Sequence, residues 1–102
     1  MIIKLEKFGK ILLFQENGKK AFLAIQTNLK KLKENENIEI DFTGITTFTP
    51  SWGDEFLTPL LRAYNGRLML GDTSNPSVLA VLGILEKTSG KVFNKIANNT
   101  QK

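Results

Sequence analysis

Residues 38–57 read IEIDFTGITTFTPSWGDEFL and carry the clearest structural signal in the chain. Ile38, Ile40 and Phe42 alternate with two acidic residues, and this period of two predicts a strand that ends near Phe42. Residues 43–49 contain four threonines and a glycine, so we expect a loop there. From Ser51 onward the apolar residues recur every three or four positions, which predicts a helix.

The predicted helix of residues 51–64 carries one apolar stripe, formed by Trp52, Phe56, Leu57, Leu60, Leu61 and Tyr64. Pro59 lies inside this helix, lacks the N–H that would bond to the carbonyl group of residue 55, and crowds that group. We therefore expect a kink or a local break at Pro59. Trp52 lies on the stripe and in the first turn, so we expect a core residue or, alternatively, a partly exposed contact.

Upstream, the sequence predicts two strands and a helix. Residues 2–6 and 11–14 are short apolar runs separated by Gly9-Lys10, a pattern that is typical of a strand pair. Residues 19–33 carry apolar side chains at helical spacing and lysines on the other face. We expect an amphipathic helix that begins at Asn17 or Gly18.

Downstream, residues 67–70 predict a buried strand and residues 71–75 a loop. Pro76 is expected at the first position of a third helix, which ends at Ser89-Gly90. Val92-Phe93 is a candidate last strand, and residues 98–102 are expected to form a polar, disordered tail.

The predicted order of elements is β-β-α-β-α-β-α-β. Strands that alternate with helices favour a sheet covered by helices. We therefore expect one α/β domain over residues 1–97, with a mixed sheet of four or five strands and helices mainly on one face.

Composition narrows the classes of function. The chain has 102 residues, 41% of them apolar, which suits one domain with one core. It contains neither cysteine nor histidine, so disulfides, thiolate metal sites, cysteine nucleophiles and the commonest general base are excluded. We expect no enzymatic activity and no cofactor.

The longest apolar runs fall far below the roughly 20 residues of a membrane span, and lysines interrupt the N-terminus before a signal sequence can form. We therefore expect a soluble cytoplasmic protein of bacterial style that has no membrane partner.

The net charge of +4 is unevenly distributed. Residues 1–33 carry eight lysines against two glutamates, whereas residues 34–72 carry seven acidic residues against two arginines. The only basic cluster falls on the solvent face of the predicted helix. It consists of Lys19, Lys20, Lys30, Lys31 and Lys33. Nucleic-acid binding usually combines arginines with exposed aromatic side chains, so we do not expect it here.

Residues 38–57 also resemble the STAS family. In its anti-sigma-factor antagonists a strand ends in Asp-Leu-Ser, a loop carries an apolar pair, and a Ser-Gly-Leu element opens the next helix. Asp41-Phe42-Thr43, Ile45 with Phe48, and Ser51 fall on these positions. The stretch is closer still to the STAS-like domains of unknown function, whose pattern of Asp-Phe-x-Gly-Val and then Ser-Phe-Ala-Asp-Glu is similar to residues 41–45 and 51–55.

The resemblance implies that Ser51 is the phospho-acceptor of a partner, a histidine-kinase-like ATPase or serine kinase. Two positions depart from the antagonists: Thr49 replaces an acid, and Pro50 replaces a first serine. A helix N-terminus would hold a phosphate through its free N–H groups and its dipole. The alternative interpretation is that Ser51 is the N-cap, with Asp54 as a short capping-box partner, and both roles can coexist.

Four acidic residues lie near this segment. Asp54 and Glu55 are expected in the first turn of the helix, where carboxylates are stabilised by the helix dipole. Asp41 and Asp72 follow strands, at the edge where open α/β sheets bind ligands. One interpretation is that they hold a magnesium ion together with Asp54. The simpler interpretation is that both residues make loop and turn contacts.

We therefore expect a regulatory protein–protein interaction module with no catalytic residues and no metal. The expected contact surface comprises Asp41, Thr43, Gly44, Thr49, Ser51, Trp52, Asp54 and Glu55. The alternative is a module that binds a small anion or nucleotide through the loops near Asp41, Ser51 and Asp72, an activity suggested for some STAS domains.

Overall fold

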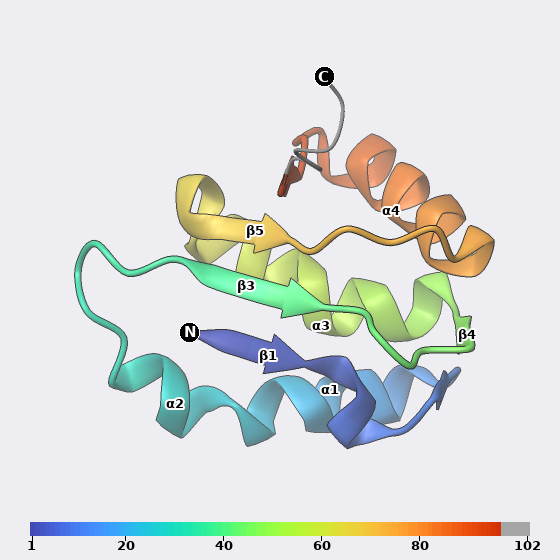
Figure 1. The fold of residues 1–102 in the computed structure, drawn as a ribbon, viewed down its shortest axis with the longest axis horizontal. Helices are drawn as coiled ribbons and strands as arrows, with labels where there is room; N and C mark the ends of the chain where they lie inside the picture. The colour runs from blue at the N-terminus through green and yellow to red at the C-terminus, as the bar shows by residue number, and fades with distance from the viewer. Residues whose placement is uncertain (97–102) are drawn as a thin grey trace.

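Strands and helices alternate along residues 1–96, the part of the chain that this computed structural model describes (Figure 1). The strands are β1 (Ile2–Lys4), β2 (Ile11–Leu12), β3 (Ile38–Asp41), β4 (Thr47–Phe48), β5 (Leu68–Leu70) and β6 (Asn94–Lys95). The helices are α1 (Gln15–Ala24), α2 (Gln26–Lys30), α3 (Pro50–Ala63) and α4 (Pro76–Ser89), with short 3-10 helices η1 (Leu5–Phe8) and η2 (Asn65–Arg67). The predicted polar tail, residues 98–102, lies outside the described residues.

The main sheet has four strands in the order β1-β3-β5-β6, and β2 pairs with β4 in a second sheet. Every pairing among the described residues is parallel, and the register aligns Ile3, Ile40 and Leu70 across three neighbouring strands. The predicted single α/β domain is confirmed. The sheet was expected to mix parallel and antiparallel strands, whereas all of its described pairings are parallel.

The predicted pairing of the first two strands is wrong. Residues 5–8 coil into η1 instead of continuing β1, and Leu5 is fully buried there. Since η1 separates the two strands, the chain makes no tight reversal at Gly9-Lys10. β2 therefore lies beside β4, and β1 lies beside β3.

Helices cover one face of the main sheet, as expected. The side chains on that face are at most 1% exposed. They are Ile3, Ile38, Ile40, Leu68 and Leu70. On the other face Ile2, Lys4, Glu39 and Met69 are exposed or half-buried. Figure 1 shows α3 passing behind the sheet, and α3 packs against both α1 and α4.

The helix predicted from residue 17 or 18 to residue 33 is two shorter helices, α1 and α2. The first begins earlier, at Gln15, and the break falls at Ile25. The N–H of Ile25 donates to the carbonyl group of Phe22, three residues back, which is the tighter bond of a 3-10 turn. The apolar spacing continues across this turn, so periodicity alone does not reveal the break.

Helix α3 runs without interruption through Pro59, so the predicted local break does not occur. Its stripe is deeply packed: Phe56, Leu57, Leu60 and Leu61 are all 0% exposed. An interior proline costs roughly 3 kcal/mol, whereas burial of each large apolar side chain contributes about 1.5–3 kcal/mol. Packing therefore holds the helix together across Pro59.

Helix α4 has the predicted limits. Asn75 Oδ1 accepts the N–H groups of Ser77 and Val78, Pro76 follows the cap, and Gly90 ends the helix with a φ of 73°. Only glycine adopts this conformation without strain. Within the described chain, none of the helices combines the length and the apolar character needed to cross a bilayer.

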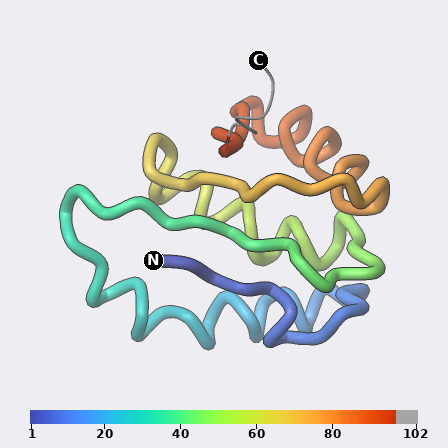
Figure 2. The backbone as a smooth tube through the Cα atoms, viewed as in Figure 1, coloured from blue at the N-terminus to red at the C-terminus, as the bar shows by residue number. Residues whose placement is uncertain are grey.

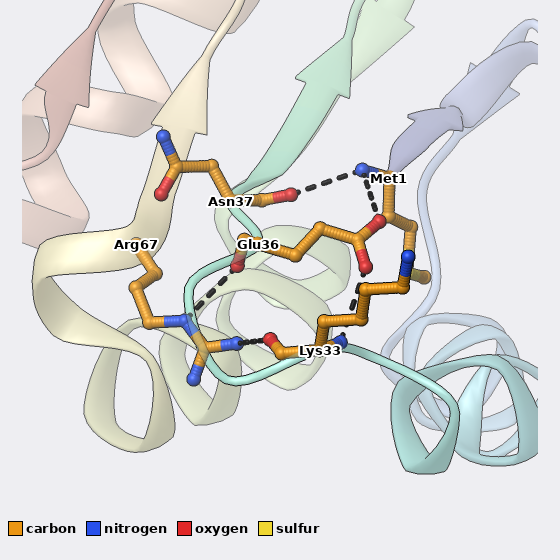
Figure 3. A network of polar contacts seen from close by, with 5 residues as sticks. All are labelled: Met1, Lys33, Glu36, Asn37 and Arg67. Carbon is orange, nitrogen blue, oxygen red and sulfur yellow. Dashed lines mark hydrogen bonds and ion pairs between the residues drawn. The ribbon is translucent and has the colours of Figure 1, made fainter.

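The connection from α2 to β3 swings round the end of the sheet where the N-terminus lies (Figure 2). The Met1 ammonium group donates to the Asn37 carbonyl group at 3.0 Å and lies 2.9 Å from Glu36 Oε2 (Figure 3). Arg67 donates to the carbonyl groups of Glu36 and Lys33, at 3.0 and 2.7 Å. Hydrogen bonds from the Met1 ammonium and then from the Lys33 amide hold the pKa of Glu36 below its ordinary value.

Candidate functional site

Asp41 ends β3 and begins a tight turn. Its Oδ1 accepts the N–H of Thr43 at 2.9 Å, and Thr43, first through its side chain and then through its amide, holds the pKa of Asp41 below its ordinary value. Gly44 follows with a φ of 86°, and a Cβ there would come within 2.5 Å of the Glu6 carboxyl group. The expected loop contact of Asp41 is therefore present, and Gly44 has a structural reason to be glycine.

Thr49, and not Ser51, is the N-cap of α3. Thr49 Oγ1 accepts the N–H of Trp52 at 3.3 Å and donates to the Leu13 carbonyl group at 2.6 Å. The helix begins at Pro50, which places Ser51 at its second position. The interpretation of Ser51 as the cap is wrong because Pro50 is the first helical residue, which moves the cap one residue upstream of it.

The side chain of Ser51 is exposed, and none of the hydrogen bonds of residues 1–96 involves its hydroxyl group. The cradle of free N–H groups expected there is largely absent. Pro50 has no N–H, Trp52 donates to the Thr49 side chain, and Gly53 donates to the Thr49 carbonyl group. Of the amide groups at the start of α3, only the Ser51 N–H has no acceptor among the described residues.

Trp52 is a core residue. It is 1% exposed and lies within a cluster of aromatic rings, 6.2 Å from Phe8, 5.7 Å from Phe48 and 5.0 Å from Phe56 between ring centroids. Of the two roles considered for Trp52, burial in the core is the observed one. In this conformation the Trp52 ring is not available to a partner.

Asp54 and Glu55 are the fifth and sixth residues of α3, beyond its first turn. The expected stabilisation of the helix start by their charges is therefore wrong, since the dipole effect is confined to the first turn. Each carboxylate is instead held by a neighbour. Thr58 donates to Asp54 Oδ1 and Gln15 donates to Glu55 Oε2, both at 2.8 Å.

A groove of about 470 Å³ lies between α3 and α4. Ser51, Asp54, Glu55 and Arg62 line it from α3, Ile84 and Leu85 line it from α4, and Gln15 lies at its end. We call this feature the Ser51 groove. The groove combines two apolar side chains of α4, two carboxylates that each accept a hydrogen bond, the guanidinium of Arg62, and a serine hydroxyl that makes no bond within residues 1–96.

The structure thus brings together three of the expected contact residues, Ser51, Asp54 and Glu55. Arg62 and Ile84 were not expected there. The polar stripe at positions 51, 55, 58 and 62 of α3 is visible in the sequence and points to Arg62. Nothing in the sequence predicts which face of α4 lies opposite, since that depends on helix packing.

Asp41 ends β3, Asp72 follows the neighbouring strand β5, and neither residue lines the Ser51 groove. Within residues 1–96, no three acidic side chains gather into a site that could hold a metal ion. The alternative magnesium site of Asp41, Asp54 and Asp72 is therefore not formed. Two carboxylates at this edge also disfavour the alternative anion or nucleotide site.

A family model described as a STAS-like domain of unknown function matches residues 18–77, from α1 to the start of α4. The chain belongs to this family. No curated protein and no solved structure matches the chain at a significant level. The matched segment of the STAS-like domain contains the whole α3 side of the Ser51 groove, and the resemblance seen in residues 38–57 is confirmed.

Proposed function

We propose that this STAS-like domain is a regulatory protein–protein interaction module that docks a protein partner at the Ser51 groove. The proposal assigns no catalytic step to the domain itself. Its partner surface consists of Ser51, Asp54 and Glu55, together with the apolar wall from α4. The turn residues Thr43 and Gly44 are exposed but do not line the groove, so this surface leaves them out.

One observation carries the proposal: the hydroxyl group of Ser51 is exposed and makes no hydrogen bond within residues 1–96, on a groove where Asp54 and Glu55 each already accept one. Residues that stabilise the fold, such as Thr49, have their hydroxyl groups occupied. An unbonded hydroxyl at a helix start, beside an apolar wall, is suited to contact with another protein.

Phosphorylation of Ser51 gives this surface a simple switch. A phosphate adds about two negative charges beside the carboxylates of Asp54 and Glu55. Among the described residues the nearby N–H without an acceptor is that of Ser51, and the cation that lines the groove, Arg62, lies eleven positions further along α3. Like charges in one groove repel one another and change what the groove can accept. We infer that the phosphorylated groove releases its partner, with a histidine-kinase-like serine kinase as the enzyme that modifies it.

The test compares variants of Ser51 for capture of a partner from the native host. Ser51→Ala is expected to retain the partner, whereas Ser51→Asp, which supplies part of the phosphate charge, is expected to lose most of it. Thr27→Asp in α2 is the matched control, since it adds the same charge at an exposed position outside the groove. The control should bind like the wild type.

Intact-mass measurement of the protein from its own host completes the test, with fragmentation to locate any phosphate at Ser51. Equal capture by Ser51→Asp and Ser51→Ala would show that the charge of residue 51 does not control binding. Loss of capture by the Thr27→Asp control would show that any added charge abolishes binding. Either result contradicts the proposed switch.

A further inference from the structure

A second hollow, of about 330 Å³, lies where the η1–β2 segment meets α1. Phe8, Ile11 and Leu12 form one wall, Lys20, Ala21 and Ala24 form the other, and Trp52 lies at its base. We call it the Lys20 groove. It shares no lining residue with the Ser51 groove.

The shape of the Lys20 groove follows from small residues on α1. A Cβ on Gly18 would lie 2.5 Å from the Trp52 carbonyl oxygen, so glycine lets α1 approach α3 closely at this point. One turn further, Ala21 and Ala24 leave space that larger side chains would fill. The groove is therefore a hollow formed by the fold itself, between the η1–β2 segment and α1, which pack on the same core.

The surroundings of the groove expose large apolar side chains. Ile11 is 61% exposed, Phe14 is 65% exposed and Leu23 is 58% exposed. All three fall within 13 consecutive residues, on the segment that runs from β2 into α1. Of these three, Ile11 lines the groove and adds exposed apolar surface to it.

Lysines outnumber acidic residues on the segments that form the groove. Lys7, Lys10, Lys19 and Lys20 lie on the segments that form it, against Glu6 and Glu16. Glu6 is paired with Lys10 at 3.8 Å, and no salt bridge within the described chain involves Lys7, Lys19 or Lys20. No acidic residue of the described part of the chain lines the groove itself. Lys20 lines the groove, and the Lys7 ammonium group lies 5.3 Å from the ring centroid of Phe8 in its wall. Positive charge beside an apolar floor is complementary to an acidic segment that carries apolar side chains.

We propose that the Lys20 groove is a second docking site, which binds an acidic protein segment through apolar side chains inserted between β2 and α1. The concave floor favours a protruding side chain over a flat lipid surface. The apolar walls disfavour a nucleic acid, whose binding requires contacts with phosphates. This site is independent of the Ser51 groove and extends the proposed function to a domain with two partners.

The test is selection of short peptides from a random display library on the wild-type protein. The enriched peptides are expected to combine aspartate or glutamate with leucine or phenylalanine. Lys20→Glu reverses one rim charge and Ala24→Glu fills the groove, and each should weaken the selected peptides about tenfold or more. Both positions are exposed, so these variants should keep the fold, which thermal unfolding checks.

The matched control is Ala80→Glu, which makes the same change at an exposed alanine of α4 outside both grooves. This control and Ser51→Asp should bind the selected peptides like the wild type. The proposal is overturned by the absence of enrichment, by enriched peptides without acidic residues, or by binding that survives both groove variants. It is also overturned if Ala24→Glu abolishes sedimentation with phosphatidylglycerol vesicles or a self-association seen by ultracentrifugation.

Discussion

The hydroxyl group of Thr49 joins two parts of the fold, since it accepts from the Trp52 N–H inside α3 and donates to the Leu13 carbonyl group after β2. Ser51, two residues on, makes no such bond within the described chain. One residue therefore anchors the helix while the other is left for contacts outside the domain. Both are hydroxyl residues near a helix start, and only their positions relative to Pro50 separate their roles.

Thr49→Ala should lower the free energy of unfolding by about 1–2 kcal/mol, because it removes a cap and leaves the Leu13 carbonyl group without this donor. Ser51→Ala should change it by less than about 0.5 kcal/mol, as expected of an exposed side chain without bonds. Urea unfolding measures both. Thr49→Ser should retain most of the stability, and a larger loss for Ser51→Ala than for Thr49→Ala would contradict this assignment.

At the scale of helices and strands, features set by neighbouring residues could be predicted from the sequence. The limits of α4 are an example, because Asn75, Pro76 and Gly90 act within one turn of the helix ends. The partner of each strand could not be predicted in the same way. The residues that pair β2 with β4 are about 36 positions apart in the sequence, so no local pattern predicts this pairing.

Some features of the candidate site could likewise be predicted from local sequence, and others depend on the fold. Ser51, Asp54 and Glu55 could be identified from one stretch of sequence. The cap could not be placed without the observed start of α3 at Pro50, and the apolar wall of the groove required the packing of α4 against α3. The burial of Trp52 was one of two alternatives that the stripe allowed, and the fold decides between them.

The contact between the α2–β3 connection and the N-terminus should depend on pH. The pKa of Glu36 is lower in the folded chain than its ordinary value of 4.5, so this contact stabilises the fold above that pH and weakens as the pH falls through the lowered value. Glu36→Gln should be less stable than the wild type at neutral pH, and the difference should shrink on acidification below 4.5.

Urea midpoints measured from neutral to acidic pH test this dependence. The matched control is Glu34→Gln, in the same connection, which makes no ion pair within residues 1–96. The control should follow the pH profile of the wild type. A difference between Glu36→Gln and the wild type that stays constant with pH would contradict the role of the Glu36 charge.

At the scale of the whole molecule, a parallel sheet carries helices on one face, and the helical layer forms two grooves of different chemistry. Among the described residues, Asp54, Glu55 and Arg62 are the charged residues that line the Ser51 groove, whereas the charged residue that lines the Lys20 groove is Lys20 itself. Both lie against α3, whose Ser51 lines one and whose buried Trp52 lies beneath the other. One continuous helix, α3, thus supports both proposed contacts.

The central claim is that the charge state of Ser51 controls docking at its groove. The most direct measurement is the affinity of the captured partner for two forms of the full chain, one with serine and one with phosphoserine incorporated at position 51. We predict that the phosphoserine form binds at least about tenfold more weakly, with an unchanged fold by circular dichroism. Equal affinity of the two forms would contradict the account.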